Sequence, residues 1–135
     1  MSYGVAAALQ AAIYQRLMAD TALDALIGSA IYDAVPPGAV GGTYVSIGPE
    51  VATDASSQTD QGAVHEFSVS VVTDAAGFQN AKVVAAAVSD ALVGATLVLA
   101  RGRLVGLWFL RAKARRVEDA DVRRIDLIFR ARVEE

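Results

Sequence analysis

The chain has no cysteine and a single histidine, His65, among its 135 residues. Without thiols it can form no disulfide or thiolate site, and one imidazole is too few for the usual zinc sites. Ser56 and Ser57 lack the strand-to-helix setting of a serine nucleophile, and no Gly-Lys-Ser/Thr follows the glycines of residues 38–42. These absences predict a protein that is not an enzyme and that holds no metal and no cofactor.

Long apolar runs are also missing. The run at 104–110 is far shorter than the roughly 20 residues that a membrane-spanning helix needs. No basic segment precedes the apolar positions near the N-terminus, so we expect no secretory signal and place the protein inside the cell that makes it. The composition is nevertheless apolar, with 54% hydrophobic residues and a mean hydropathy of +0.39. We therefore expect part of the surface to be covered by copies of the chain or by a partner.

Basic residues are scarce until late in the chain. Residues 1–100 carry two basic and nine acidic side chains, whereas residues 101–135 carry ten basic and six acidic ones. Such polarity favours an oriented contact with a neighbour. Long arginine side chains that cover the outer face of strands explain the pattern equally well.

Hydrophobic periodicity predicts the fold. Apolar residues recur every three or four positions from Val5 to Leu17, which predicts a first helix, and an alanine-rich helix capped by Asp74 is expected at 76–92. Period-two alternation or short apolar runs predict strands at 31–33, 43–49, 63–73, 96–99, 103–113 and 123–133. A proline-glycine turn is expected at 36–38. The pattern predicts one α+β domain, residues 1–135, in which two main helices pack on one face of a mixed or antiparallel sheet, a two-layer sandwich.

A polar stretch without periodicity, residues 50–62, separates two of these strands. Thirteen residues exceed the two to five of an ordinary hairpin loop, and loops of this length in compact domains are mostly functional or disordered. His65, which follows this stretch, is expected to be a hydrogen-bonded histidine of an edge strand and not a catalytic base.

Basic residues cluster with aromatic ones near Trp108 and Phe109, a combination found on nucleic-acid-binding surfaces. Because the chain is acidic overall, with a pI near 5.1, we favour a core or interface position for Trp108. Passive contact with passing DNA stays open. The acidic turn at 117–121 is expected to be solvated.

Read in order, the chain resembles the tail-terminator, or tail-completion, family of long-tailed bacteriophages and phage-like gene transfer agents. The resemblance covers nearly the whole chain and is carried by AAIYQRL, IYDAVPPGA, TYVSIGP, the polar stretch, HEFSVSVVTDAAGFQNAKVVAAAVSDAL, LVLA and RRIDLIFRARVEE. It implies a structural virion protein, assembled in the host cytoplasm, that forms a homo-hexameric ring on the head-proximal end of the tail tube. That ring would stop polymerisation of the tube protein, join the tail to the head-side connector and let DNA pass through its channel.

For this role we expect the polar stretch to bind the tube or the connector, and two arginines to contact an acidic neighbour. The candidate partner-binding residues are Asp54, Ser56, Ser57, Gln58, Asp60, Gln61, Arg115 and Arg116. Two alternatives stay open: a head-tail connector stopper or tail tube protein, and, from another class, a small nucleic-acid-binding or ligand-binding domain.

Overall fold

A computed structural model describes residues 3–35 and 41–135. The elements in chain order are α1 (Ala6–Met18), α2 (Thr21–Ile27), β1 (Ile31–Tyr32), β2 (Thr43–Asp54), β3 (Gly62–Thr73), α3 (Gln79–Leu92), β4 (Arg103–Val117), the short 3-10 turn η1 (Glu118–Ala120) and β5 (Val122–Glu134). In these ranges no helix combines the length and the apolar character needed to cross a membrane.

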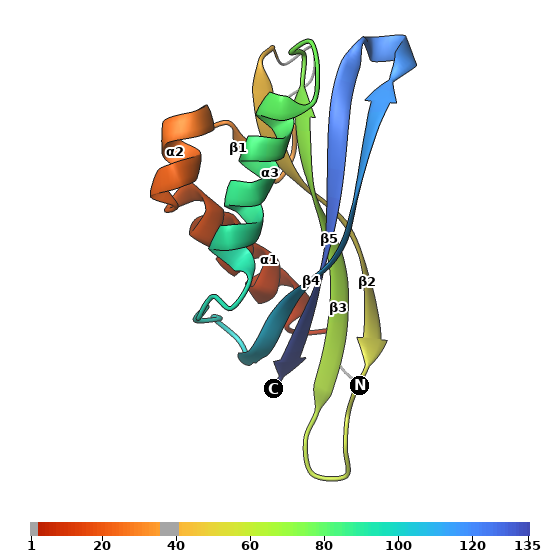
Figure 1. Ribbon diagram of the computed structural model, residues 1–135. Helices are drawn as coiled ribbons and strands as arrows, with labels where there is room; N and C mark the ends of the chain where they lie inside the picture. The colour runs from red at the N-terminus through yellow and green to blue at the C-terminus, as the bar shows by residue number, and fades with distance from the viewer. Residues whose placement is uncertain (1–2, 36–40) are drawn as a thin grey trace.

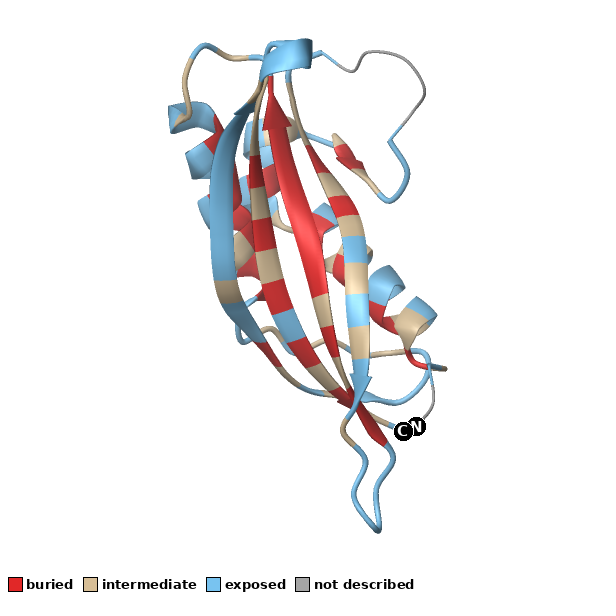
Figure 2. Ribbon diagram, turned by 90° about the vertical axis from the view of Figure 1, so that its right-hand side faces the viewer, coloured by how far each residue is buried: buried red, intermediate tan, exposed pale blue. Residues whose placement is uncertain are grey.

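The strands form one twisted sheet in the order β1-β2-β3-β5-β4, and the helices lie together on one of its faces (Figure 1). β1 is parallel to β2, and every other pair is antiparallel. Among the residues that the structure describes, no helix lies over the opposite face (Figure 2). This arrangement confirms the predicted α+β two-layer sandwich with a mixed sheet.

The hydrophobic core lies between the sheet and the helices because alternate side chains of each strand point to the same face. On β3 and β5 the apolar positions Val69, Val71, Leu127 and Phe129 are buried on the helix side. β3 occupies the centre of the sheet and is buried along most of its length, whereas the outermost strand β4 is largely exposed (Figure 2).

The helix predictions are confirmed, with one correction. The predicted stripe of α1, from Val5 to Leu17, is buried, and so is the alanine-rich face of α3. α3 begins at Gln79, however, and Asp74 does not cap it. The Asp74 carboxylate instead accepts a hydrogen bond from the Gly42 backbone N–H at 2.9 Å, which ties the start of β2 to the end of β3.

The loop within the polar stretch of residues 50–62 is shorter than the sequence predicted. β2 continues to Asp54 and pairs with β3 from Glu50 to Asp54, so only residues 55–61 form the loop. Five of the thirteen residues, 50–54, are therefore strand although their side chains show no alternation. Main-chain pairing between strands does not require such alternation. The strand expected at 96–99 does not form. The turn expected at 36–38 lies outside the described residues.

Replacement of Phe129 tests the core. Its ring is fully buried, stacks on Phe67 at 5.6 Å between centroids and meets the edge of Phe109 at 5.9 Å. Phe129→Ala should lower the free energy of unfolding by about 3–5 kcal/mol, measured by chemical denaturation. Val98→Ala, at an almost fully exposed position, should change it by less than about 0.5 kcal/mol. Equal effects of the two substitutions would contradict this packing.

Candidate functional site

The loop of residues 55–61 projects beyond the sheet at the end where the C-terminus lies (Figures 1 and 2). Its own hydrogen bonds order it. The Ala55 N–H donates to the Gly62 carbonyl at 3.0 Å, and the Ser57 N–H donates to the Asp60 carbonyl at 2.9 Å. The Ser57 hydroxyl in turn accepts the Asp60 N–H at 3.1 Å. The loop is thus a turn fixed by serine hydroxyls and backbone groups.

The base of the loop is attached to its neighbours. The Ser56 hydroxyl donates to Asp54 at 2.7 Å and accepts the Gly62 N–H at 3.2 Å. The hydrogen bond from Ser56 lowers the pKa of Asp54, which stays exposed to solvent. The Glu135 N–H reaches the Gln61 carbonyl at 2.9 Å. These contacts hold the loop in line with the strands instead of letting it fold back on the sheet.

Arg115 and Arg116 lie near the opposite end of the sheet, beside η1. Because they are successive residues of β4, their side chains point to opposite faces. Arg115 is 3.7 Å from Asp126 on the helix-free face, and Arg116 is 3.3 Å from the exposed carboxylate of Asp121. The eight predicted partner-binding residues therefore form two groups, roughly 35 Å apart at about 3.3 Å per strand residue.

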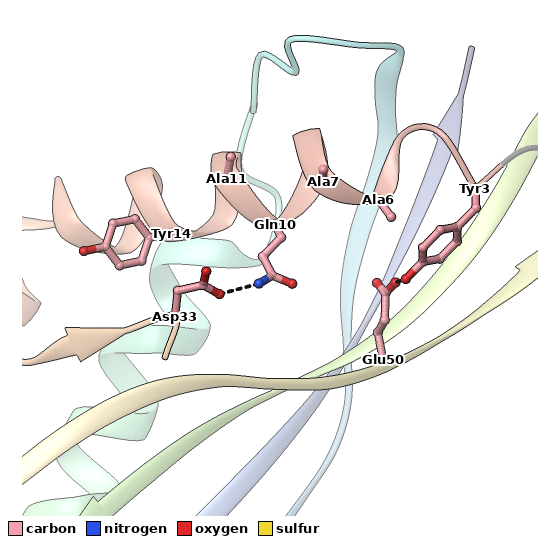
Figure 3. Close-up of a pocket in the computed structure, with 8 residues that line it drawn as sticks. All are labelled: Tyr3, Ala6, Ala7, Gln10, Ala11, Tyr14, Asp33 and Glu50. Atoms are coloured by element: carbon pink, nitrogen blue, oxygen red, sulfur yellow. Dashed lines mark hydrogen bonds between the residues drawn. The ribbon is translucent and has the colours of Figure 1, made fainter. Parts of the chain in front are cut away.

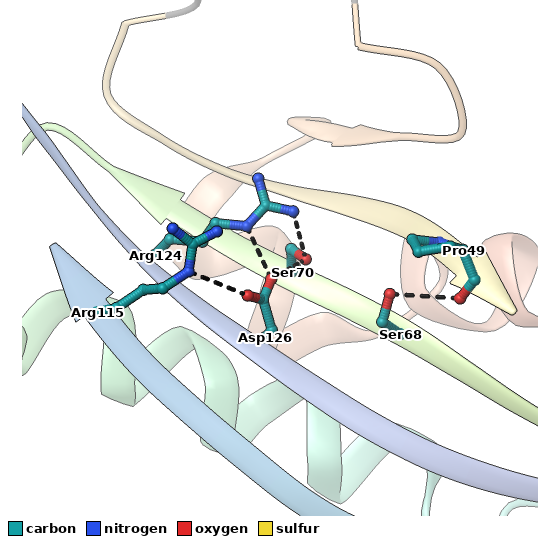
Figure 4. Close-up of polar contacts among 6 residues, drawn as sticks. All are labelled: Pro49, Ser68, Ser70, Arg115, Arg124 and Asp126. Atoms are coloured by element: carbon teal, nitrogen blue, oxygen red, sulfur yellow. Dashed lines mark hydrogen bonds and ion pairs between the residues drawn. The ribbon is translucent and has the colours of Figure 1, made fainter. Parts of the chain in front are cut away.

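A polar cluster around Asp126 occupies the helix-free face (Figure 4). The Ser70 hydroxyl donates to the Asp126 carboxylate at 2.6 Å, and the Arg124 guanidinium donates to the same oxygen at 2.7 Å. Arg124 also donates to Ser70 at 3.1 Å. Partial burial opposes ionisation of Asp126, but the hydrogen bonds from Ser70 and Arg124 and the nearby charge of Arg115 outweigh it, so the pKa of Asp126 is lowered. Through these contacts the cluster connects β3, β5 and β4.

Basic side chains outnumber acidic ones on the rest of this face. Strand alternation places Arg111, Lys113 and Arg115 of β4 on it, together with Arg130 and Arg132 of β5. Most of the late basic residues in the sequence therefore lie on one face of the sheet. The arginines do cover the outer face of strands, as one of the two sequence interpretations had it, whereas the oriented contact with a neighbour stays a prediction.

An open groove of about 560 Å³ lies between α1 and β2 (Figure 3). Small side chains of α1 form one wall, and polar groups line the rest. The lining residues are Tyr3, Ala6, Ala7, Gln10, Ala11, Tyr14, Asp33 and Glu50. Four of the polar groups form two pairs: the Tyr3 hydroxyl donates to Glu50, and the Gln10 amide donates to Asp33. The hydrogen bond to Glu50 and the charge of that carboxylate raise the pKa of Tyr3.

Below this groove, His65 is buried on the central strand β3, at 1% exposure, and is not the edge histidine that the sequence suggested. The edge assignment was wrong because β3, the strand that carries His65, pairs with β2 on one side and with β5 on the other. Its Nδ1 atom is 3.1 Å from a Glu50 carboxylate oxygen, and its Nε2 atom has no hydrogen-bond partner in the structure. The ring lies 6.1 Å from that of Tyr3. Glu50 thus links the N-terminal segment to the core.

No group of three or more histidine, cysteine or acidic side chains in the described ranges could hold a metal ion. Two aromatic side chains of β4 are conspicuously exposed instead: Trp108 at 47% and Phe109 at 43%. Trp108 is therefore not a core residue, and its position at an interface stays a prediction. Its indole lies over Gly106, where any side chain would collide with the ring.

The sequence model of tail completion protein gp17 matches residues 11–134. The chain belongs to this family. It is a structural protein of a phage-type tail, and its place is in a virion or phage-like particle. The matched range includes every strand, α2, α3, most of α1 and both groups of predicted partner-binding residues.

A solved structure supports the same conclusion. The chain is 73% identical to a chain in the structure "Virion of native gene transfer agent (GTA) particle", with a TM-score of 0.93. The alignment covers 99% of this chain and 100% of that one. Among curated proteins, no sequence matches the chain.

Sequence reasoning missed the groove and the Asp126 cluster. Both join residues that are distant along the chain, such as Tyr3 with Glu50 and Ser70 with Asp126. The alternation Ser68, Ser70 against Val69, Val71 did signal that small polar side chains share one face. Nothing in it indicated that Asp126 would lie opposite Ser70.

Replacement of Asp126 tests the cluster through its pH dependence. Because the pKa of Asp126 is lower in the folded than in the unfolded state, its ionised form stabilises the fold at neutral pH. This contribution is lost as the pH falls through the folded-state pKa. Asp126→Asn should therefore lower the free energy of unfolding by about 1–3 kcal/mol at pH 7, and the difference from wild type should shrink towards about pH 2.

The matched control is Asp121→Asn, since Asp121 is an exposed carboxylate paired with an exposed arginine and its left-handed backbone suits asparagine. It should change stability by less than about 0.5 kcal/mol at either pH. A loss in Asp126→Asn that is the same at both pH values would show that the carboxylate charge is not what stabilises the cluster.

Proposed function

We propose that this chain forms a hexameric ring on the end of the completed tail tube, stops polymerisation of the tube protein and joins the tail to the head-side connector. Residues 1–135 act as one domain in this role. The observation that carries the proposal is the family match over residues 11–134, together with the near-complete alignment to a chain of a gene transfer agent virion. Surplus apolar composition and exposed aromatic residues on a sheet edge support self-association.

The two ends of the sheet provide two separate docking sites, as a protein between tube and connector requires. The ordered loop of residues 55–61 presents Gln58 and Asp60 at one end. At the other end, Arg116 and the acidic turn η1 form a second, charged surface. Strands that run from one end to the other give the body the stiffness to hold both surfaces at a fixed separation.

DNA that passes through the ring meets the helix-free face in this proposal. That face carries more cations than carboxylates, and Asp126 is neutralised by Arg124 and Arg115. Because phosphate contacts of this kind are independent of sequence, the DNA can slide past without being held at one place.

A connector stopper or a tail tube protein is the nearest alternative, because both assemble as rings. The mass of the assembled protein in solution distinguishes a terminator from a tube protein. A terminator should stop at a closed ring of six times 14.1 kDa, whereas a tube protein should polymerise without limit. A small ligand-binding domain is less well supported, because four of the polar groups in the groove between α1 and β2 already form two pairs, Tyr3 with Glu50 and Gln10 with Asp33.

The direct test removes the chain from the particle. Particles made without it should have tails of uncontrolled length or tails not joined to heads, seen by electron microscopy, and the purified chain should restore joining when added back. Particles of normal length and yield without the chain would refute the proposed function.

The loop is tested by a double substitution that keeps its backbone hydrogen bonds. Gln58→Ala with Asp60→Ala removes two exposed side chains for which the structure shows no internal hydrogen bond, while the backbone groups of Asp60 keep their partners. The yield of joined particles should fall about tenfold, because hot-spot side chains carry most of an interface's binding energy. Gln79→Ala with Asp90→Ala, at exposed positions of α3, is the matched control and should leave the yield unchanged. Equal yields from both variants would exclude the loop as a docking site.

A further inference from the structure

Both outer edges of the sheet offer unpaired backbone groups. β4 is the last strand on one side, and within the described residues its outer edge pairs with no other strand; the Leu107 carbonyl accepts a hydrogen bond from the Gly94 N–H at 3.5 Å. On the other side, β1 pairs only with Val45 and Ser46 of β2, so β2 is free from Glu50 to Asp54. Exposed edges of this kind either pair with another strand or have to be protected.

The β4 edge carries an apolar and basic surface that we call the aromatic edge: Val105, Trp108, Phe109 and Arg111. All four are exposed. Trp108 is on the helix-free face, and Phe109 is on the helix side. Tryptophan and arginine are the residues most enriched at the energetic centres of protein interfaces.

The β2 edge carries the complementary surface. On the helix side it opens into the groove lined by α1, which contains the carboxylates of Asp33 and Glu50 and no lysine or arginine. On the helix-free face, Val51 is 67% exposed. One edge is therefore aromatic and basic, and the other is small, apolar and acidic.

The strand register puts the aromatic edge and the β2 edge at the same position along the strand direction, which we call their height. Across the sheet, Phe109 is aligned with Phe129, Phe67 and then Glu50. In the neighbouring row, Trp108 is aligned with Arg130, Glu66 and then Val51. A rotation about an axis along the strands keeps positions along that axis, so it can place Trp108 of one copy beside Val51 of the next. The same rotation brings Phe109 to the groove beside Glu50.

We propose that the aromatic edge of one copy docks against the β2 edge of the next copy, with Phe109 in the α1–β2 groove and Trp108 on Val51. β2 and β4 run in opposite directions, so the joined edges are antiparallel, the commoner arrangement. The contact uses two different surfaces and is therefore heterologous, which closes into a ring when the rotation allows it. This inference rests on the proposed ring and specifies its subunit interface.

Cysteine cross-linking tests the contact without background, because the chain has no cysteine of its own. Val51→Cys and Arg111→Cys place thiols on the helix-free side of the two edges and leave Trp108 and Phe109 intact. A short bis-maleimide reagent is applied to the purified protein and to assembled particles. Leu26→Cys, at an exposed position of α2, replaces Val51→Cys in the control pair.

The double variant should give a ladder of cross-linked species that ends at six copies. An equal mixture of the two single variants should give dimers and nothing larger, since each copy then carries one half of the contact. Dimers from either single variant alone would show a symmetric contact and overturn the inference. Absence of the ladder in particles that contain a ring would overturn it as well, while the proposed function would stand. A normal particle without this chain refutes the function and not the edge contact.

Substitution of the aromatic anchor gives an independent measurement. Trp108→Ser should reduce ring formation by about tenfold or more, measured by sedimentation, because a half-exposed indole at the centre of the contact is lost. Its circular dichroism spectrum should stay that of the wild type. Leu26→Ser removes an apolar side chain of comparable exposure from the outer helix layer and should leave assembly unchanged. Equal assembly of the two variants would exclude Trp108 from the interface.

Discussion

The structure depends on the uninterrupted antiparallel pairing of β3 with β5, which runs from Gly62 opposite Glu134 to Thr73 opposite Arg123. This pairing has no bulge, so side chains alternate strictly between the two faces over its whole length. Valine, leucine and phenylalanine fall on the side that the helices cover. Serine, arginine and aspartate fall on the other. A shift by one residue would exchange the two sets and destroy both the core and the Asp126 cluster.

The outer strands are less regular, and this difference has a structural role. β2 has an irregularity between Ile47 and Glu50, and β4 has two, near Val105 and Leu110. Bulges, charged residues and strong twist are the usual means of keeping edge strands from pairing at random. In this sheet the irregularities lie in the outer strands, and the central pairing of β3 with β5 has none. The central pairing therefore stabilises the fold, and the proposed contacts between copies use the edges.

In the proposed function, the ends and edges of the strands make the contacts with neighbouring proteins. The hairpin loop and the η1 turn are held far apart by strands that are rigid along their length, and the basic residues are gathered on the uncovered face. A protein built in this way can contact two neighbours along one axis and its own copies around it. In the proposed ring, the same sheet determines both the length of the body and the direction of its lateral contacts.

The sequence by itself determined the two-layer fold, because period-two and period-3.6 patterns are local and each residue's neighbours along the chain reveal its face. It also determined the family, through an ordered series of segments that spans the chain. It did not reveal that residues 50–54 are strand, since their partners at 63–67 supply the hydrogen bonds and their side chains alternate only weakly. Only the tertiary structure decided that Trp108 is exposed, that His65 is central, and that Ser70, Arg124 and Asp126 form one cluster. Each of these depends on which distant segment lies alongside, and that is fixed by strand order and register across the sheet.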